Sequence, residues 1–283
     1  MKDAHSQMRY CVGFAVCLVL FGGQGSMAQG AYKPITVSNG GTIDGRVSFN
    51  GTNKDKKDLE VTKDERVCGR SKPAQTLVVG KNYGVQNAVI YLEGITEGKK
   101  WAASKTSALD QRGCDYSPHV SIIPSGGALE IVNDDPILHN VHLYNFSSVD
   151  QTICNIAQPV KGQRTKVDQV RTLQCGFLHA TCDAGHPWMS AYIVRADNPY
   201  YVLTDKKGEF KLTGVPAGTY KLTMWHEGVK VTKTLVENGK VSKYYFEEPY
   251  ATTKLVTVLQ DETVHVDFQL AVRQPPDDRS TVH

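Results

Sequence analysis

The sequence predicts an all-β protein built from sandwich domains. Short segments rich in Val, Ile, Tyr and Thr recur after residue 40 and are separated by Gly, Asn, Asp and Pro, which is the pattern of β-sandwiches and barrels. No stretch of ten residues carries the 3.6-residue apolar period of an amphipathic helix. The length suits one large β domain or two small ones.

The first residues have the features of an export signal. Lys2 and Arg9 accompany an apolar run from Tyr10 to Phe21, and the small residues around Ala28 are those that a signal peptidase reads. We expect residues 1–28 to be a signal peptide cleaved after Ala28, and the mature protein to be periplasmic or secreted. The run is too short to span a bilayer and no later segment reaches that length, so we expect no membrane span.

The charges of the chain are nearly balanced. It has 32 Lys and Arg residues against 29 Asp and Glu residues, and the expected leader removes two cations and one anion. Since no concentrated basic patch stands out, we expect no nucleic-acid partner.

The cysteines predict disulfides and one thiol left over. Seven are present, and the five that follow the expected leader are an odd number for an oxidising compartment. We expect disulfides between Cys68 and Cys114 and between Cys154 and Cys175, which leaves Cys182 for a metal. The alternative pairs Cys175 with Cys182 and leaves another cysteine alone.

Candidate strands follow one another along the chain, each with β-branched or aromatic residues between turn residues. They are Thr42–Phe49, Asn87–Leu92, Val120–Ile123, Ala128–Val132, Asn140–Tyr144, Trp188–Val194, Glu209–Leu212, Tyr220–Met224 and Val264–Leu270. The charged segment Asn53–Arg66 is expected to be a solvated loop with at most one short helical turn. Residues 273–283 are expected to form a disordered tail.

A change in composition near Asp197 divides the chain into two domains. The cysteines and most of the histidines lie before it, and we assign residues 40–196 to a first domain. Residues 197–272 form a second domain, in which Asp205–Gly208 and Pro216–Gly218 are expected to be tight turns between strands.

One loop contains a set of residue types that is typical of a metal site. Cys182, His186 and Met189 lie within eight residues, and His139 lies upstream. Two imidazoles, one thiolate and a weak axial thioether are the ligands of a blue-copper electron-transfer site. Taken singly, each residue has a structural interpretation, since Met is usually a core filler and Cys182 could form a disulfide. Together they predict one bound copper, with Trp188 as hydrophobic shielding of the site.

Residues 116–145 resemble the segment of plastocyanin and amicyanin in which two strands and a short loop lead to a His-Asn-Val ligand. His186-Pro-Trp-Met189 is similar to the end of the amicyanin ligand loop. The resemblance implies a cupredoxin-like Greek-key β-sandwich, with His139, Cys182, His186 and Met189 as ligands of a mononuclear, type-1-like copper. It also implies that Asn140 braces the ligand loop.

The ligand loop departs from that family at one point. Three residues separate Cys182 from His186, where plastocyanin and amicyanin have two. The longer spacing also resembles the binuclear copper motif of cytochrome oxidase subunit II, but that motif needs a second cysteine at the position of Leu178. A mononuclear site is therefore favoured, and its spectroscopic class stays open.

The second half resembles carboxypeptidase-regulatory-like domains, which are transthyretin-like β-sandwiches. The resemblance is carried by Asp205–Leu222, by Gly45–Gly51 and by Asn87–Leu92. It implies a second sandwich that could be discontinuous, with residues 42–92 contributing strands either to it or to the copper domain.

The function predicted from these features is periplasmic electron transfer, with a redox partner protein such as a cytochrome and no enzymatic activity of its own. Two alternatives stay open. One is a non-redox β-sandwich module that binds a glycan or an envelope protein, with Cys182 in a disulfide. The other is copper storage or delivery by the same residues.

Overall fold

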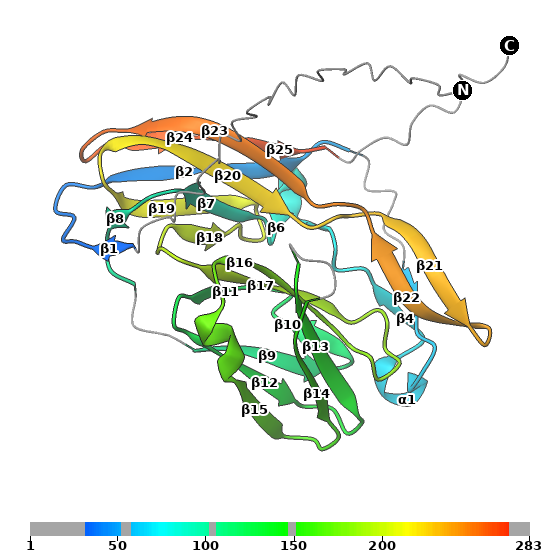
Figure 1. The fold of residues 1–283 in the computed structure, drawn as a ribbon. Helices are drawn as coiled ribbons and strands as arrows, with labels where there is room; N and C mark the ends of the chain where they lie inside the picture. The colour runs from blue at the N-terminus through cyan, green and yellow to red at the C-terminus, as the bar shows by residue number, and fades with distance from the viewer. Residues whose placement is uncertain (1–31, 52–57, 102–105, 147–150, 272–283) are drawn as a thin grey trace, which may run out of the picture. The chain divides into compact units, whose positions relative to one another are not determined.

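The computed structural model describes residues 32–51, 58–101, 106–146 and 151–271 (Figure 1). Strands dominate these residues, as the sequence predicts. The helical elements within these ranges are short: α1 (Glu65–Cys68), η2 (Lys81–Tyr83) and η3 (Asp168–Thr172). None of the helices in the described ranges has the length and apolarity needed to cross a membrane. The expected signal peptide and tail lie outside these ranges.

Two sheets form the sandwich that carries the predicted ligands. The first sheet has, in order, the strands β10 (Asp115–Ser117), β9 (Thr106–Arg112), β12 (Ala128–Asn133) and β15 (Gln163–Val167). The second sheet has, in order, the strands β11 (Val120–Pro124), β17 (Ser190–Ala196), β16 (Gly176–Thr181), β13 (His139–Asn145) and β14 (Thr152–Gln158). Pairing is parallel between β9 and β12 and between β11 and β17, and antiparallel elsewhere. This arrangement agrees with a cupredoxin-like β-sandwich.

Two further sheets form a second sandwich. Their strands, in sheet order, are β18 (Tyr201–Leu203), β7 (Val89–Glu93), β20 (Gly218–His226) and β23 (Tyr250–Val258) in one, and β19 (Glu209–Val215), β2 (Gly41–Phe49) and β24 (Thr263–His265) in the other, where β25 (Phe268–Leu270) also pairs with β2. Strands β2 and β7 thus share sheets with strands that follow residue 197, which is the discontinuous arrangement that the sequence left open.

Four small ribbons complete the described strands. They are β1 (Lys33–Pro34) with β8 (Glu97–Gly98), β3 (Asp58–Glu60) with β4 (Ser71–Pro73), β5 (Val78–Val79) with β6 (Val85–Gln86), and the hairpin of β21 (Val231–Glu237) with β22 (Lys240–Phe246). The hairpin turns at Asn238 and Gly239, whose φ angles of 51° and 74° suit the Asn-Gly turns that join twisted antiparallel strands.

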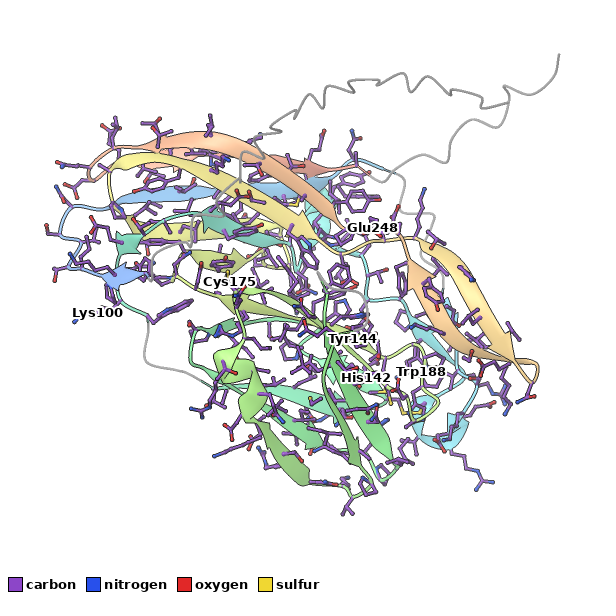
Figure 2. All side chains as sticks on the ribbon, in the orientation of Figure 1. Lys100, His142, Tyr144, Cys175, Trp188 and Glu248 are labelled. Carbon is purple, nitrogen blue, oxygen red and sulfur yellow. A yellow bond between two sulfur atoms is a disulfide. The ribbon has the colours of Figure 1, made fainter. Side chains whose placement is uncertain are left out.

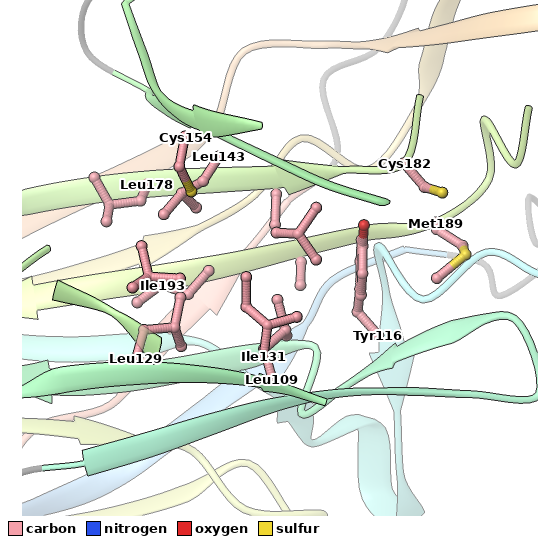
Figure 3. Close-up of a cluster of buried hydrophobic side chains, with 14 of the residues drawn as sticks. Leu109, Tyr116, Leu129, Ile131, Leu143, Cys154, Leu178, Cys182, Met189 and Ile193 are labelled. Carbon is pink, nitrogen blue, oxygen red and sulfur yellow. The ribbon is translucent and has the colours of Figure 1, made fainter. Parts of the chain in front are cut away.

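Each sandwich has its own apolar core. Strand β2 alternates between fully and partly buried positions, because successive side chains of a strand point to opposite faces. In the first core, Leu129, Ile131 and Ile193 pack between the sheets, and Cys182 and Met189 lie at one end (Figure 3). A third cluster, which includes Val120, Tyr192 and Trp225, joins the two sandwiches.

Every expected strand overlaps an observed one, although several ends differ by two or three residues, and two of the differences have a structural cause. The strand expected at Trp188–Val194 begins only at Ser190, because the Met189 amide donates to the His186 carbonyl in a turn. The strand expected at Val264–Leu270 is split into β24 and β25.

Candidate metal centre

The four predicted ligands come from three points of one sheet. His139 begins β13, Cys182 directly follows β16, and His186 and Met189 lie in the loop that leads to β17. Their residues are buried, with 5% of Cys182 exposed and 0% of each of the other three. Since polar groups are buried only when they have partners, the contacts of these side chains decide what the cluster can do.

Three of the four side chains aim donor atoms at one point. The Nδ1 atoms of His139 and His186 lie 3.1 Å apart, and the Cys182 sulfur lies 3.5 Å from the His186 Nδ1. Metal–nitrogen bonds of about 2.0 Å and metal–sulfur bonds of about 2.3 Å, as at zinc sites, would span both separations. The sulfur atoms of Cys182 and Met189 lie at the same end of the core (Figure 3).

Two carboxylates hold the outer nitrogens of the same rings. The Nε2 atom of His139 lies 2.8 Å from Asp135 Oδ2, and the Nε2 atom of His186 lies 2.9 Å from Asp64 Oδ2. An ionised carboxylate only accepts hydrogen bonds, so each Nε2 carries a ring proton. The two Nδ1 atoms are left facing one another at 3.1 Å. When both rings are neutral, each Nδ1 presents a lone pair, and a cation between them satisfies both.

The pKa shifts of His186 and Cys182 indicate which protons a metal would have to displace. Burial lowers the pKa of His186, against the opposing effect of the hydrogen bond to Asp64, so the ring is neutral at pH 7. Burial raises the pKa of the Cys182 thiol, although hydrogen bonds with the backbone of Ala184, Asn140 and His186 act in the other direction. A metal would have to displace the thiol proton, which makes its affinity depend on pH.

Asn140 and Trp188 hold the ligand loop from two sides. The Asn140 side-chain oxygen accepts a hydrogen bond of 2.9 Å from the Asp183 amide, directly after Cys182. The Trp188 indole donates to the carbonyl of Cys114 at 3.0 Å, and its ring lies 5.2 Å from that of His186. Trp188 is 5% exposed and therefore shields the imidazole while it ties the loop to the opposite sheet.

The cysteines follow only half of the expected pairing. A disulfide joins Cys68 to Cys114, as expected. Cys154 and Cys175 are free thiols, so the second expected disulfide is wrong. Cys154 lies in the core on the edge strand β14, directly opposite Leu143 of β13 (Figure 3).

Cys182 is also free, which excludes the alternative bond to Cys175. Cys175 is exposed and lies well away from Trp188 in the ligand loop (Figure 2). Its position precedes β16, whereas Cys182 follows the same strand, and six residues of extended chain separate the two thiols.

Two residues of this centre were missed in the sequence. Asp135 lies four residues before His139, and this spacing in the loop ahead of the ligand was a usable signal. Asp64 lies in the segment that was expected to be solvated, 122 positions from His186. A further cluster of Cys114, Asp135 and His139 shares a ligand with the first, but the disulfide removes the thiolate of Cys114.

Comparison with known proteins finds partly similar solved structures and no relative by sequence. No protein-family model and no curated protein matches the chain. Similar solved structures include a copper-containing nitrite reductase from Thermus scotoductus SA-01, with 19% identity over 35% of this chain and 23% of that chain at a TM-score of 0.26.

Two small cupredoxins are also similar. A reduced amicyanin variant shares 18% identity over 34% of this chain and 86% of its own, at a TM-score of 0.28. A purple cupredoxin from Nitrosopumilus maritimus shares 24% identity over 29% of this chain and 81% of its own, at a TM-score of 0.23. These similarities cover about a third of the chain, and we therefore base the assignment of a metal on the side chains alone.

Proposed function

We propose that this chain is an exported electron-transfer protein with one mononuclear, type-1-like copper held by His139, Cys182, His186 and Met189. The observation that carries the proposal is the convergence of the two Nδ1 atoms of His139 and His186 and the buried Cys182 thiol on one point. A set of two imidazoles, one thiolate and a weak axial thioether is characteristic of copper electron-transfer sites.

The residues of the chain supply a rigid set of donors. Copper, when bound, supplies a one-electron cupric–cuprous couple. Asp135 and Asp64 fix the orientation of the two imidazoles, as outer hydrogen bonds do at many metal sites. Asn140 fixes the backbone next to Cys182. Donors that are held in this way move little when the charge at their centre changes, which favours fast electron transfer.

The burial of the site favours electron transfer over the two alternatives. A protein that delivers copper must pass the metal to a partner, whereas the side chains of His139 and His186 are completely buried. The glycan- or protein-binding alternative relied on a disulfide at Cys182, and that thiol is free.

The cellular setting follows from the predicted signal peptide. We propose a periplasmic or secreted location and a redox protein such as a cytochrome as partner. The second sandwich, with its resemblance to carboxypeptidase-regulatory-like domains, would dock the copper domain on an envelope protein or glycan.

A spectrum of the copper-loaded protein tests the proposal. We expect the Cu(II) form to show intense thiolate-to-copper absorption and a matching EPR signal, both lost in Cys182→Ser. The control is Cys175→Ser, which removes a free thiol outside the cluster and should leave both spectra unchanged. Copper binding that persists in Cys182→Ser, or the absence of thiolate absorption in the wild type, would reject the proposal.

A further inference from the structure

The outer edge of His186 is covered by a segment from far away in the sequence. We call residues 58–70, which run from β3 through α1, the cover segment. Asp64 in this segment accepts the hydrogen bond from His186 Nε2. Next to it, the Lys63 ammonium donates to the Ala184 carbonyl at 2.7 Å, so two consecutive residues of the cover contact the ligand loop.

The fit between the cover and the ligand loop is close at Gly185. The φ angle of Gly185 is 91°, a backbone conformation that favours glycine. A Cβ atom at this position would lie 2.9 Å from the Lys63 side chain. Gly185, one of the three residues between Cys182 and His186, therefore lies beneath the cover.

The cover segment is anchored from three directions. Leu59 and Val61 belong to the core of the copper-domain sandwich. Cys68, at the end of α1, is bonded to Cys114, whose carbonyl accepts the Trp188 indole proton.

The third anchor is the β21–β22 hairpin. Its Tyr244 hydroxyl accepts a hydrogen bond from the Glu60 amide, and its Val241 carbonyl accepts one from the Thr62 hydroxyl. The cover segment is therefore hydrogen-bonded to the β21–β22 hairpin as well. These three anchors hold Asp64 in contact with His186.

The carboxylate of Asp64 accepts its hydrogen bond from His186 and does not cap its own helix. Asp64 occupies the N-cap position of α1, but its side chain makes no capping hydrogen bond there. Its side chain is 32% exposed, while that of His186 is 0% exposed. Asp64 thus stands between the imidazole and the solvent.

We propose that Asp64 is a positioning residue that keeps the proton of His186 on Nε2 and closes the site to external ligands at that edge. The first half concerns the metal-free protein as well, and the second rests on the proposed copper function. Because Nδ1 is kept unprotonated before any metal arrives, no proton has to move between the ring nitrogens when the metal binds.

Two substitutions at Asp64 distinguish the effect of its carboxylate from the effect of its backbone conformation. The φ angle of Asp64 is 55°, which glycine adopts without strain, so Asp64→Gly removes the side chain and leaves the turn intact. Asp64→Asn removes the charge and keeps an oxygen that can accept from Nε2. The matched control is Glu65→Gln, which removes the same charge from the next, exposed residue.

The tautomer is measured in the metal-free protein by 15N NMR of the imidazoles at neutral pH. We expect the Nε2–H form of His186 in the wild type, in Asp64→Asn and in Glu65→Gln, and a mixture of both tautomers in Asp64→Gly. An unchanged His186 tautomer in Asp64→Gly, or an Nδ1–H form in the wild type, would overturn the assignment to Asp64.

The closure is measured on the copper-loaded protein with azide as the external ligand. We expect azide to leave the wild-type and Glu65→Gln spectra unchanged and to give a new charge-transfer band in Asp64→Gly. Loss of an outer hydrogen bond weakens metal binding by about 10- to 100-fold, and we expect a loss of this size in Asp64→Gly. Azide binding to the wild type would overturn the closure.

Failure of this inference is distinguishable from failure of the proposed function. If the His186 tautomer responds to Asp64→Gly but no thiolate-to-copper band forms in the wild type, the copper function fails and the positioning role stands. If the band forms and neither the tautomer nor the azide response changes in Asp64→Gly, the copper function stands and the role of Asp64 is rejected.

Discussion

Buried histidines contact carboxylates in two regions of this molecule, and the two regions differ in what the second ring nitrogen does. In the candidate metal centre, His139 and His186 each place one nitrogen against a carboxylate and turn the other nitrogen toward the other ring. Between the sandwiches, His119 contacts Glu227 through Nε2 and the Ser190 carbonyl through Nδ1 at 3.0 Å.

This difference sets the charge of the ring. The Ser190 carbonyl and an ionised Glu227 carboxylate both accept hydrogen bonds, so these contacts favour the imidazolium form of His119, which donates from both nitrogens. Burial alone lowers the pKa of His119, but the charge and hydrogen bond of Glu227 outweigh that effect and the net pKa is raised. A buried histidine that contacts a carboxylate is therefore a candidate metal ligand only when its other ring nitrogen has neither a hydrogen-bond donor nor an acceptor as partner.

The largest effect is expected from removing Glu227. Glu227→Ala would leave the His119 imidazolium buried without its counter-ion, and we expect the free energy of unfolding at pH 7 to fall by about 3 to 5 kcal/mol. Urea denaturation measures it. The exposed Glu237 provides the control Glu237→Ala, and the double variant His119→Leu with Glu227→Leu should recover much of the loss. A loss below 1 kcal/mol in Glu227→Ala would contradict a charged His119.

The next effect is the acid sensitivity of His179, in the same region. Burial lowers the pKa of His179 to about 3, below the value of about 6.5 expected in the unfolded chain. Between these values the unfolded state binds more protons, so stability rises with pH and falls on acidification from pH 6.5 toward pH 3. The loss from pH 7 to pH 4.5 amounts to about 2 to 3 kcal/mol.

His179→Phe keeps a ring in the stack with Tyr192, whose centroid lies 4.5 Å away, and it cannot be protonated. We expect this variant to lose less stability than the wild type when both are unfolded in urea at pH 7 and at pH 4.5. Equal losses in the two proteins would show that His179 does not titrate in this range.

A smaller effect is expected at Asp135. Asp135→Asn weakens the acceptor for His139 Nε2, and we expect metal affinity to fall by about 10- to 100-fold. Competition titration with a chelator measures the change. Asp134→Asn is the matched control, because Asp134 is paired with Arg112 at the surface. Glu227→Gln, in the region between the sandwiches, should leave the metal affinity unchanged. If Glu227→Gln and Asp135→Asn lowered the metal affinity equally, the two regions would not differ in the way proposed.

The smallest effect is expected at Ser190, which lies between the regions. Its hydroxyl is 2.8 Å from His179 Nε2, whereas its carbonyl serves His119. Ser190→Ala removes only the hydroxyl contact, and we expect a loss of about 0.5 to 1.5 kcal/mol in the free energy of unfolding. Metal affinity should not change, although Met189 is the adjacent residue. A change in affinity would mean that the two regions are coupled.

Strands with a long apolar run were predictable, whereas several strands with only a few apolar residues, such as β16 and β23, were not. Strand β12, with the sequence Ala-Leu-Glu-Ile-Val-Asn, is almost fully buried and was expected at nearly its true bounds. No position of strands β21 and β22 is fully buried, and they were not predicted. The Asn-Gly pair between them was a hairpin signal that the sequence did contain.

The sequence by itself determined the local parts of the candidate site. The order of His139, Cys182, His186 and Met189 and their short loop were sufficient to predict a set of copper ligands, because the three last donors are constrained by one short stretch of chain. The all-β class was determined in the same way, since the side-chain period of a strand is visible over five or six residues.

Only the tertiary structure decided which distant groups meet. Asp64 reaches His186 across 122 positions, and Glu227 reaches His119 across 108. Neither carboxylate carries a local signal, because the pairing depends on how sheets, the Cys68–Cys114 bond and the β21–β22 hairpin bring segments together. The pairing of cysteines has the same origin, and for that reason the expected bond between Cys154 and Cys175 was wrong.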